Sequence, residues 1–281
     1  MSDSKKILRP FQKRLHSSGR IRVWSIVISI FGELVQPRKQ SISVQELLAL
    51  TGHVDIEENA LRTALSRLAK EGWVEREKQG RLAFYSLSET GKKTFLVASE
   101  RIYNHSFESP SSDWNLALFK EPISTVKDSV PVGFTLSRQW QLINSEDLSK
   151  LDNNEVVLFP TQAVDVPDWA FNKLVPEALN QQYSELLSDL SHLNADSSTI
   201  RKLSPLSALV LRYLLIHAWR RLVLRHPLVP QGLLPSSWPG ARCHQALCEL
   251  YPTLVTQSEG WWETPTPATG THMLKSRFKA I

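Results

Sequence analysis

The chain has 281 residues, of which 42% are hydrophobic, 22% charged and 9% aromatic. This composition excludes a disordered or collagen-like chain, and the length predicts about two or three folded domains. The two cysteines, Cys243 and Cys248, are too few for a disulfide scaffold, and we expect both to be buried thiols. The uncharged run at residues 23–31 is too short to cross a membrane, and no cleavage site of small residues follows it. We therefore expect a cytoplasmic protein.

The net charge of +5 is unevenly distributed. Residues 1–107 carry +7, whereas residues 108–281 carry −2. A positive N-terminal third is typical of a nucleic-acid-binding module attached to a part with a different role. A basic tail without a role would give the same excess. We expect residues 1–22 to form a basic arm, which either adds non-specific DNA contacts or makes none.

Three helices are predicted in the next part of the chain. Apolar residues dominate residues 23–31 and form the first helix, which Gly32 is expected to end. The sequence SVQE at residues 43–46 is a capping box that opens a second, short helix. Asp55 is expected to cap a third helix over residues 56–71.

The third helix has two contrasting faces. Its apolar stripe, which is expected to face a core, consists of Ala60, Leu61, Ala64, Leu65 and Leu68. The opposite face carries Asn59, Arg62, Thr63, Ser66, Arg67 and Lys70. Arginine suits guanine and asparagine suits adenine, while lysine reaches phosphates, so this face is a candidate DNA reader. The alternative is an ordinary solvated helix face.

A β-hairpin is predicted after this helix. Residues 73–76 and 82–87 form its strands, and the basic loop between them contains Lys78 and Arg81. Three helices followed by such a hairpin are the order of a winged helix-turn-helix. In that fold the third helix lies in the major groove and the hairpin wing lies along the backbone. We expect this domain to span residues 23–107, including an exit helix, with both basic loop residues contacting phosphate or the minor groove.

The remaining chain divides into two parts after a polar, turn-rich linker. Strands are predicted at residues 114–119 and 155–159, with weaker ones at 132–134 and 140–143. These strands indicate a small α+β domain over residues 113–167. The pattern of residues 168–281 is helical, with helices expected over 176–193, 205–224 and 241–251.

The apolar helix over residues 205–224 and the residue after it carry cationic side chains. Guanidinium groups beside an apolar pocket suit an anionic ligand with an apolar head. The candidate effector-binding residues are His217, Arg220, Arg221 and Arg225. The alternative, favoured for any single arginine, is an ion pair with an acidic residue of a neighbouring helix or a second subunit.

Two separated blocks of the sequence resemble the PaaX family of transcriptional repressors, which control phenylacetic acid degradation. The first block is ALRTALSRLAKEGW at residues 60–73, followed by Gly80-Arg81 and FYSL at 84–87. The second begins with LLIHAWRR at residues 214–221 and continues with PLVP, LLP and WPG, at residues 227–230, 233–235 and 238–240. The resemblance covers most of the chain.

The resemblance implies a homodimeric repressor of three parts that binds double-stranded operator DNA. These are an N-terminal winged helix, a ferredoxin-like middle domain similar to CRISPR-associated endoribonucleases, and a helical C-terminal domain linked to dimerisation and effector response. It also implies that an aryl-acetyl coenzyme A thioester, phenylacetyl-CoA, releases the operator. The family carries Asp where this chain has His226, which puts one family ion pair in doubt.

Enzyme interpretations find little support in the sequence. No nucleophile elbow, metalloprotease helix, dinucleotide-binding loop or P-loop motif occurs. A nuclease like the middle domain's relatives needs a metal-binding carboxylate just after the first strand, where this chain has Lys120. We therefore expect no catalytic residue, metal or cofactor apart from the effector. A DNA- or RNA-binding protein without an effector remains the alternative.

Overall fold

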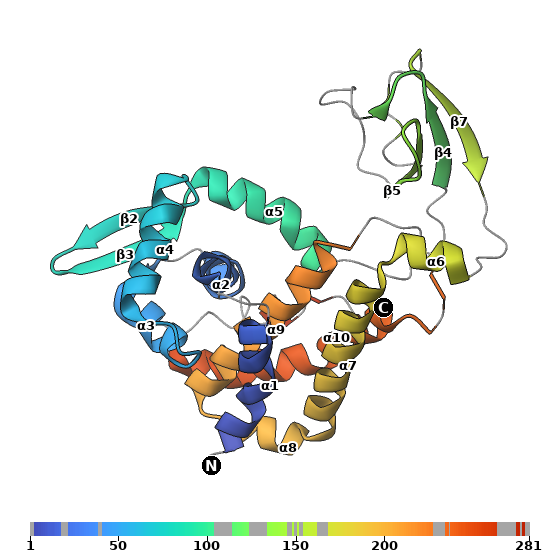
Figure 1. Ribbon diagram of the computed structural model, residues 1–281. Helices are drawn as coiled ribbons and strands as arrows, with labels where there is room; N and C mark the ends of the chain where they lie inside the picture. Colours follow the sequence, from blue (N-terminus) through green and yellow to red (C-terminus); the bar gives the residue numbers. More distant parts are fainter. Residues whose placement is uncertain are drawn as a thin grey trace. The chain divides into compact units, whose positions relative to one another are not determined.

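The protein is an α+β protein with two small antiparallel sheets (Figure 1). The computed structural model describes residues 3–17, 22–38, 41–103, 114–123, 134–144, 148, 151, 154–161, 168–226, 234–235, 237–262, 274–275 and 277–278. The chain divides into two compact units. The first consists of Met1–His105, Glu185–Leu224 and Cys243–Ala280, and the second consists chiefly of Ser106–Ser184 and Arg225–Arg242.

The helices of the chain follow its apolar pattern. They are α1 (Asp3–Ser17), α2 (Val23–Ile30), α3 (Val44–Gly52), α4 (Glu58–Lys70), α5 (Glu89–Tyr103), α6 (Asp168–Leu174), α7 (Glu177–Ala195), α8 (Ser197–Ile200), α9 (Pro205–Val223) and α10 (Pro239–Ser258). The expected capping box at the start of α3 is present, because the Ser43 hydroxyl accepts from the Glu46 N–H while the Glu46 carboxylate accepts from the Ser43 N–H. The expected cap at Asp55 was wrong. Asp55 has φ of 57° and α4 begins only after Glu57.

Helix α9 lies at the centre of the first unit. Almost all of its residues are buried, and it contacts α1, α2, α3 and α5. Its Tyr213 hydroxyl donates to the Leu50 carbonyl at 3.0 Å, and Trp219 Nε1 donates to the Ile102 carbonyl at 2.7 Å. The sequence predicted separate domains for residues 23–107 and 168–281. In the structure, parts of both segments belong to the first unit. A helix that is buried on almost all sides needs packing partners around it, and the N-terminal helices supply several of them.

Within the segment expected to be a basic arm, residues 3–17 form a helix. Ile7, Leu8, Phe11 and Leu15 of α1 are buried, and α1 packs on α9. Arg14 also forms ion pairs with Glu185 and Asp189 of α7. The lysines that suggested an arm occupy the exposed side of α1, while its apolar side contributes to the core of the first unit.

Gly32 does not end the first helix as expected. Helix α2 continues directly into a π-helical turn, Phe31–Val35. A Cβ atom at Gly32 would lie 1.9 Å from Cε2 of Phe95 on α5. The glycine is therefore required for the close approach of α5, and the helix runs through it.

The first sheet has the order β1-β3-β2, with β1 at Ile42–Ser43, β2 at Val74–Gln79 and β3 at Leu82–Leu87. Its hairpin is longer than expected, because Gln79 pairs directly with Leu82 and leaves a two-residue turn. Gly80 in this turn has φ of 62°, which a tight hairpin turn demands at its first central position.

The second unit contains a sheet of four antiparallel strands. Its order is β5-β6-β4-β7, with β4 at Trp114–Phe119, β5 at Phe134–Thr135, β6 at Trp140–Asn144 and β7 at Val156–Thr161. Ala117, Phe119 and Ile143 form the buried core on one face of this sheet. The predicted strands are thus all present, although residues 132–133 lie outside the described part of the chain. None of the described helices is long and apolar enough to span a membrane.

The contact between Gly32 and Phe95 gives a test of the packing. Gly32→Ala should lower the free energy of unfolding by about 1–3 kcal/mol, because the new methyl group overlaps the Phe95 ring. Adding Phe95→Leu should restore part of the loss, as urea denaturation would measure. Gly52→Ala is the matched control, since a Cβ there meets nothing within 4 Å. Equal effects of both alanine substitutions would contradict the packing argument.

Candidate DNA-binding surface and ligand cavity

The polar face predicted for the third helix is exposed on α4. All six of its candidate residues lie on the surface: Asn59, Arg62, Thr63, Ser66, Arg67 and Lys70. The apolar stripe faces inward, with Leu61, Ala64, Leu65 and Leu68 buried, and α4 packs against α2. The amphipathic pattern therefore fixes which side of α4 is presented to a partner.

Two arginines of this face take part in exposed ion pairs along the helix. Arg62 Nη2 lies 2.5 Å from Glu58 Oε1, and Arg67 Nε lies 2.7 Å from Glu71 Oε1. The Arg67 guanidinium also lies 5.8 Å from the centre of the Trp24 ring. Such exposed pairs contribute only about 0.3–0.5 kcal/mol each. A phosphate or a base can therefore replace the glutamates at small cost.

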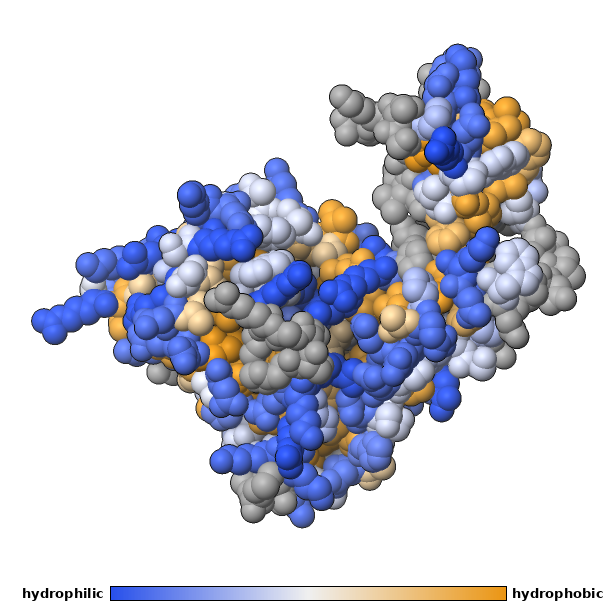
Figure 2. All heavy atoms as spheres, viewed as in Figure 1, coloured by the Kyte–Doolittle hydropathy of each residue, from blue (hydrophilic) through white to orange (hydrophobic). Residues whose placement is uncertain are grey.

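The β2–β3 hairpin carries Lys78 on strand β2 and Arg81 in its turn, and both are exposed. The hairpin projects from the first unit next to α4 (Figure 1). In Figure 2 the surface over this hairpin is predominantly hydrophilic. The first unit therefore presents two candidate DNA-contacting elements, one helix and one hairpin.

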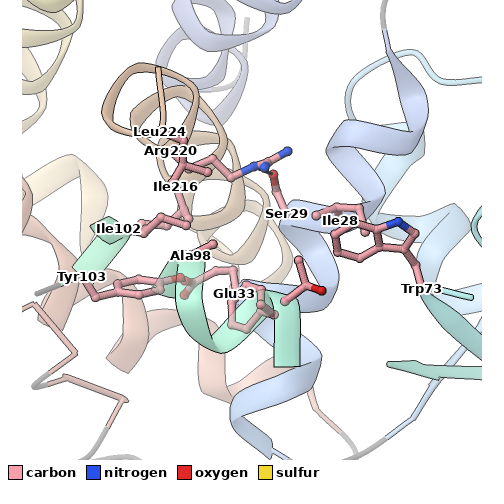
Figure 3. A pocket seen from close by; sticks show the side chains of 12 residues that line it. Ile28, Ser29, Glu33, Trp73, Ala98, Ile102, Tyr103, Ile216, Arg220 and Leu224 are labelled. Atoms are coloured by element: carbon pink, nitrogen blue, oxygen red, sulfur yellow. Dashed lines mark hydrogen bonds between the residues drawn. The ribbon is translucent and has the colours of Figure 1, made fainter. Parts of the chain in front are cut away.

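A cavity of about 230 Å³ lies between α2, α5 and α9 within the first unit. Its walls are mostly apolar, and Figure 3 shows the side chains around it. The lining residues are Ile28, Ser29, Glu33, Trp73, Thr94, Phe95, Ala98, Ile102, Tyr103, Ile216, Arg220 and Leu224. Arg220 is therefore the one candidate effector residue of the four that lines this cavity.

The guanidinium of Arg220 is bound by serine oxygens of α2. Its Nε donates to Ser29 Oγ at 2.6 Å, and its Nη2 donates to the carbonyl and the hydroxyl of Ser25, both at 2.7 Å. No carboxylate among the described residues forms an ion pair with it. Burial, together with the charge of Arg221, lowers the pKa of Arg220 to about 10. The alternative interpretation, an ion pair with an acidic residue, is therefore not met for Arg220 by the described residues.

The other three candidates occupy different places. His217 is buried behind the cavity wall, and its Nδ1 lies 2.9 Å from Ser29 Oγ. Arg221 is partly buried and Arg225 is exposed. Arg225 belongs to the second unit, whereas the other three belong to the first.

A buried cluster of charges adjoins the cavity. The Glu33 carboxylate accepts hydrogen bonds from Arg212 Nε at 2.6 Å, from the Tyr251 hydroxyl at 2.6 Å, and from the Tyr103 hydroxyl. Arg277 Nη1 lies 3.3 Å from the same carboxylate. Burial raises the pKa of Tyr251 to about 12, and the nearby Glu33 charge adds to this rise. The Tyr251 hydroxyl therefore stays protonated and acts as a donor.

No cluster of three or more metal-ligating side chains occurs in the described ranges of the chain. His244 lies near Cys248, with Nδ1 3.7 Å from Sγ. Lys120 is exposed at the end of β4 and lies 3.4 Å from Glu155.

Both terminal parts of the chain match known family models. Residues 22–91 match the model described as PaaX-like protein, and residues 175–264 match the PaaX-like protein C-terminal domain. The transcriptional repressor PaaX of Escherichia coli (strain K12) is 28% identical over 250 residues, which cover 81% of this chain and 78% of that protein. The chain belongs to the PaaX family. The family resemblance inferred from the two sequence blocks is thereby confirmed.

In this PaaX-family chain the two matched segments meet within one unit. Glu33 lies in the first matched segment, while Arg212 and Tyr251 lie in the second. The cavity likewise has walls from both, since α2 belongs to the first and α9 to the second. The sequence did not identify Ser29, Tyr103 or Trp73 as cavity residues. Their positions in helices and at the start of a strand do not indicate which residues line a cavity.

The Glu33 cluster gives a stability test. Glu33→Gln should lower the free energy of unfolding by about 3–5 kcal/mol, because Arg212 and Arg277 would lose their buried counter-charge. Glu58→Gln, which breaks the exposed pair with Arg62, should cost only about 0.5 kcal/mol. Urea denaturation measures both. Similar losses in the two variants would show that the buried cluster does not join the helices as described.

The buried histidine predicts how stability depends on pH. Burial and the charges of Arg220 and Arg221 lower the pKa of His217 well below its ordinary value of 6.5. Below about pH 6.5 the unfolded chain therefore binds a proton that the folded protein does not, and stability falls as the pH decreases. His217→Gln should flatten this acid limb in denaturation curves measured at several pH values. A slope unchanged by the substitution would contradict the assignment.

Proposed function

We propose that this PaaX-family protein is a sequence-specific DNA-binding transcriptional repressor whose helices α2, α3 and α4 and β2–β3 hairpin act as a winged helix. The exposed polar face of α4, beside a projecting basic hairpin, is the observation that carries this proposal. Its homology to a transcriptional repressor supports a regulator rather than an enzyme.

The proposed roles follow from side-chain chemistry. In the major groove, arginine pairs best with guanine and asparagine with adenine, while hydroxyl groups bond to several bases. The proposed base-contacting residues are Asn59, Arg62, Thr63, Ser66 and Arg67. Phosphate contacts are assigned to Lys70, Lys78 and Arg81, and these set the salt dependence of binding.

The proposed repressor acts as a homodimer on an inverted repeat of operator DNA. Each α4 would read one half-site, and occupation of a promoter would block transcription. Family resemblance supports control of a phenylacetate catabolic operon and release by an aryl-acyl-CoA such as phenylacetyl-CoA. A ligand releases the operator when it binds the DNA-incompetent state more tightly. Among the candidates His217, Arg220, Arg221 and Arg225, the proposal assigns effector contact to Arg220, because it lines the cavity.

A ferredoxin-like middle domain remains part of the proposal. Such a domain alternates strands and helices as β-α-β-β-α-β. Counted along the chain, the four strands of the second unit are arranged as second, third, first and fourth, and neighbouring strands are antiparallel. This order supports the ferredoxin-like arrangement. The segments that would hold its two helices lie largely outside the described residues.

Two substitutions separate base contacts from phosphate contacts. Arg67→Ala should cost about 1–3 kcal/mol on the operator and little on random DNA, because a base contact carries sequence information. Lys78→Ala should weaken both DNAs about equally and reduce the salt slope by about one. Fluorescence anisotropy on an operator selected from the promoter of the chain's own gene cluster measures both. Equal losses on operator and random DNA for both variants would refute the assigned roles, and no specific binding by the unaltered protein would refute the repressor proposal.

A further inference from the structure

We propose that the cavity between α2, α5 and α9 binds a carboxylate or acyl group that carries one ring-sized apolar substituent, with the Arg220 guanidinium as its polar anchor. This inference rests on the proposed function, because it locates the release site of the repressor. It names the part of the effector that enters the protein.

The polar end of the ligand is indicated by the charge of Arg220. The arginine is tied to α2 by three hydrogen bonds from Nε and Nη2, all to neutral serine groups. Its remaining nitrogen, Nη1, has no hydrogen-bond partner among the described residues. Partly buried cations are normally matched by a counter-charge. A ligand oxygen with negative or partial negative charge, placed at Nη1, would supply the counter-charge that the described side chains do not provide.

The charge cluster around Glu33, next to the cavity, does not provide the counter-charge of Arg220. Glu33 is the one carboxylate among the lining residues, and Arg212, Arg277 and two tyrosine hydroxyls already surround it. Figure 3 shows Arg220 reaching to Ser29, with Glu33 pointing toward a different part of the wall. The positive charge of Arg220 is therefore available to an incoming ligand.

The apolar end of the ligand is indicated by the walls and the volume. Ile28, Ile102, Ile216 and Leu224 surround the cavity with branched aliphatic side chains. An apolar cavity of about 150 Å³ holds a benzene ring. At about 230 Å³ this cavity has room for a ring and a short arm that reaches Arg220. A nucleotide carrier is too large for it, so the carrier of a thioester would stay outside.

The cavity wall also includes the residue that joins the two DNA-contacting elements. The Trp73 N–H donates to the Leu68 carbonyl of α4 at 2.9 Å. The Trp73 carbonyl accepts from the N–H of Ser88, just after β3, at 3.0 Å. Its side chain lines the cavity. A ligand that displaces the Trp73 ring therefore acts on the junction between α4 and the hairpin. Ligand binding can in this way change the affinity of these two elements for DNA.

Isothermal titration of the full chain without DNA tests the ligand class. The probes are phenylacetate and phenylacetyl-CoA, with acetate and free coenzyme A as controls that lack the ring or the acyl group. Binding of either ring-bearing probe, without binding of the controls, supports the proposal. The probe that binds tells whether the source is the free acid or the thioester. Binding of neither, or equal binding of coenzyme A, would overturn it.

Three variants test the location of the site. Ala98→Phe fills the cavity and should abolish binding, whereas Val97→Phe is a matched control on the same helix, at a residue that is 73% exposed. Arg220→Gln leaves the cavity open, keeps hydrogen-bonding groups and should weaken binding about 10- to 100-fold. Thermal unfolding confirms that each variant is folded. Unchanged affinity in folded Ala98→Phe, or in folded Arg220→Gln, would place the ligand elsewhere and overturn the proposal.

Operator binding measured on the same samples separates this inference from the proposed function. A protein that binds the operator but none of the probes would overturn the cavity assignment and leave the DNA-binding role intact. A protein that binds a ring-bearing probe but no operator would overturn the repressor role and leave the cavity assignment intact. If Trp73 transmits the signal, Trp73→Leu should release less operator than the unaltered protein when both are saturated with ligand. Full release in that variant would overturn the route through Trp73.

Discussion

The buried contact between Glu33 and Arg212 is the interaction on which the first unit depends. Both side chains are fully buried, and each would be costly in the core without the other. Glu33 lies in the π-helical turn that follows α2, and Arg212 lies in the middle of α9. The pair therefore ties the N-terminal helices to a helix that comes nearly two hundred residues later. Because the partners belong to the two family-matched segments, this contact explains why those segments form one unit.

The position of α9 then determines what surrounds the cavity. The same helix that carries Arg212 carries Arg220 two turns later, where the nearest partners are serine oxygens of α2. One turn of α9 thus stabilises the fold with a matched charge, and a later turn offers an unmatched charge at the cavity. The cavity also reaches Trp73, which joins α4 to the hairpin. The first unit consequently combines a candidate DNA-reading surface and a candidate ligand site around a shared helix.

Local signals in the sequence predicted much of this structure. The capping box at Ser43 and Glu46, the amphipathic stripe of α4 and strand β4 all depend on neighbouring residues, and all were found as expected. The errors arose where distant partners decide the structure. Gly32 marks the approach of Phe95 rather than a helix end, and the basic pattern of α1 concealed an apolar side that packs on α9. Among the four candidate effector residues, side-chain type alone could not single out Arg220, because the cavity is formed by three helices that are separated in sequence.

The central claim is that α4 and the β2–β3 hairpin together contact DNA. Hydrogen–deuterium exchange of the free and the operator-bound protein tests it most directly, because the measurement reports each segment separately. The account predicts slower exchange at residues 58–70 and 74–87 in the complex, reversed when the releasing ligand is added. Protection confined to the four-stranded sheet at residues 114–161, with α4 and the hairpin unchanged, would contradict it.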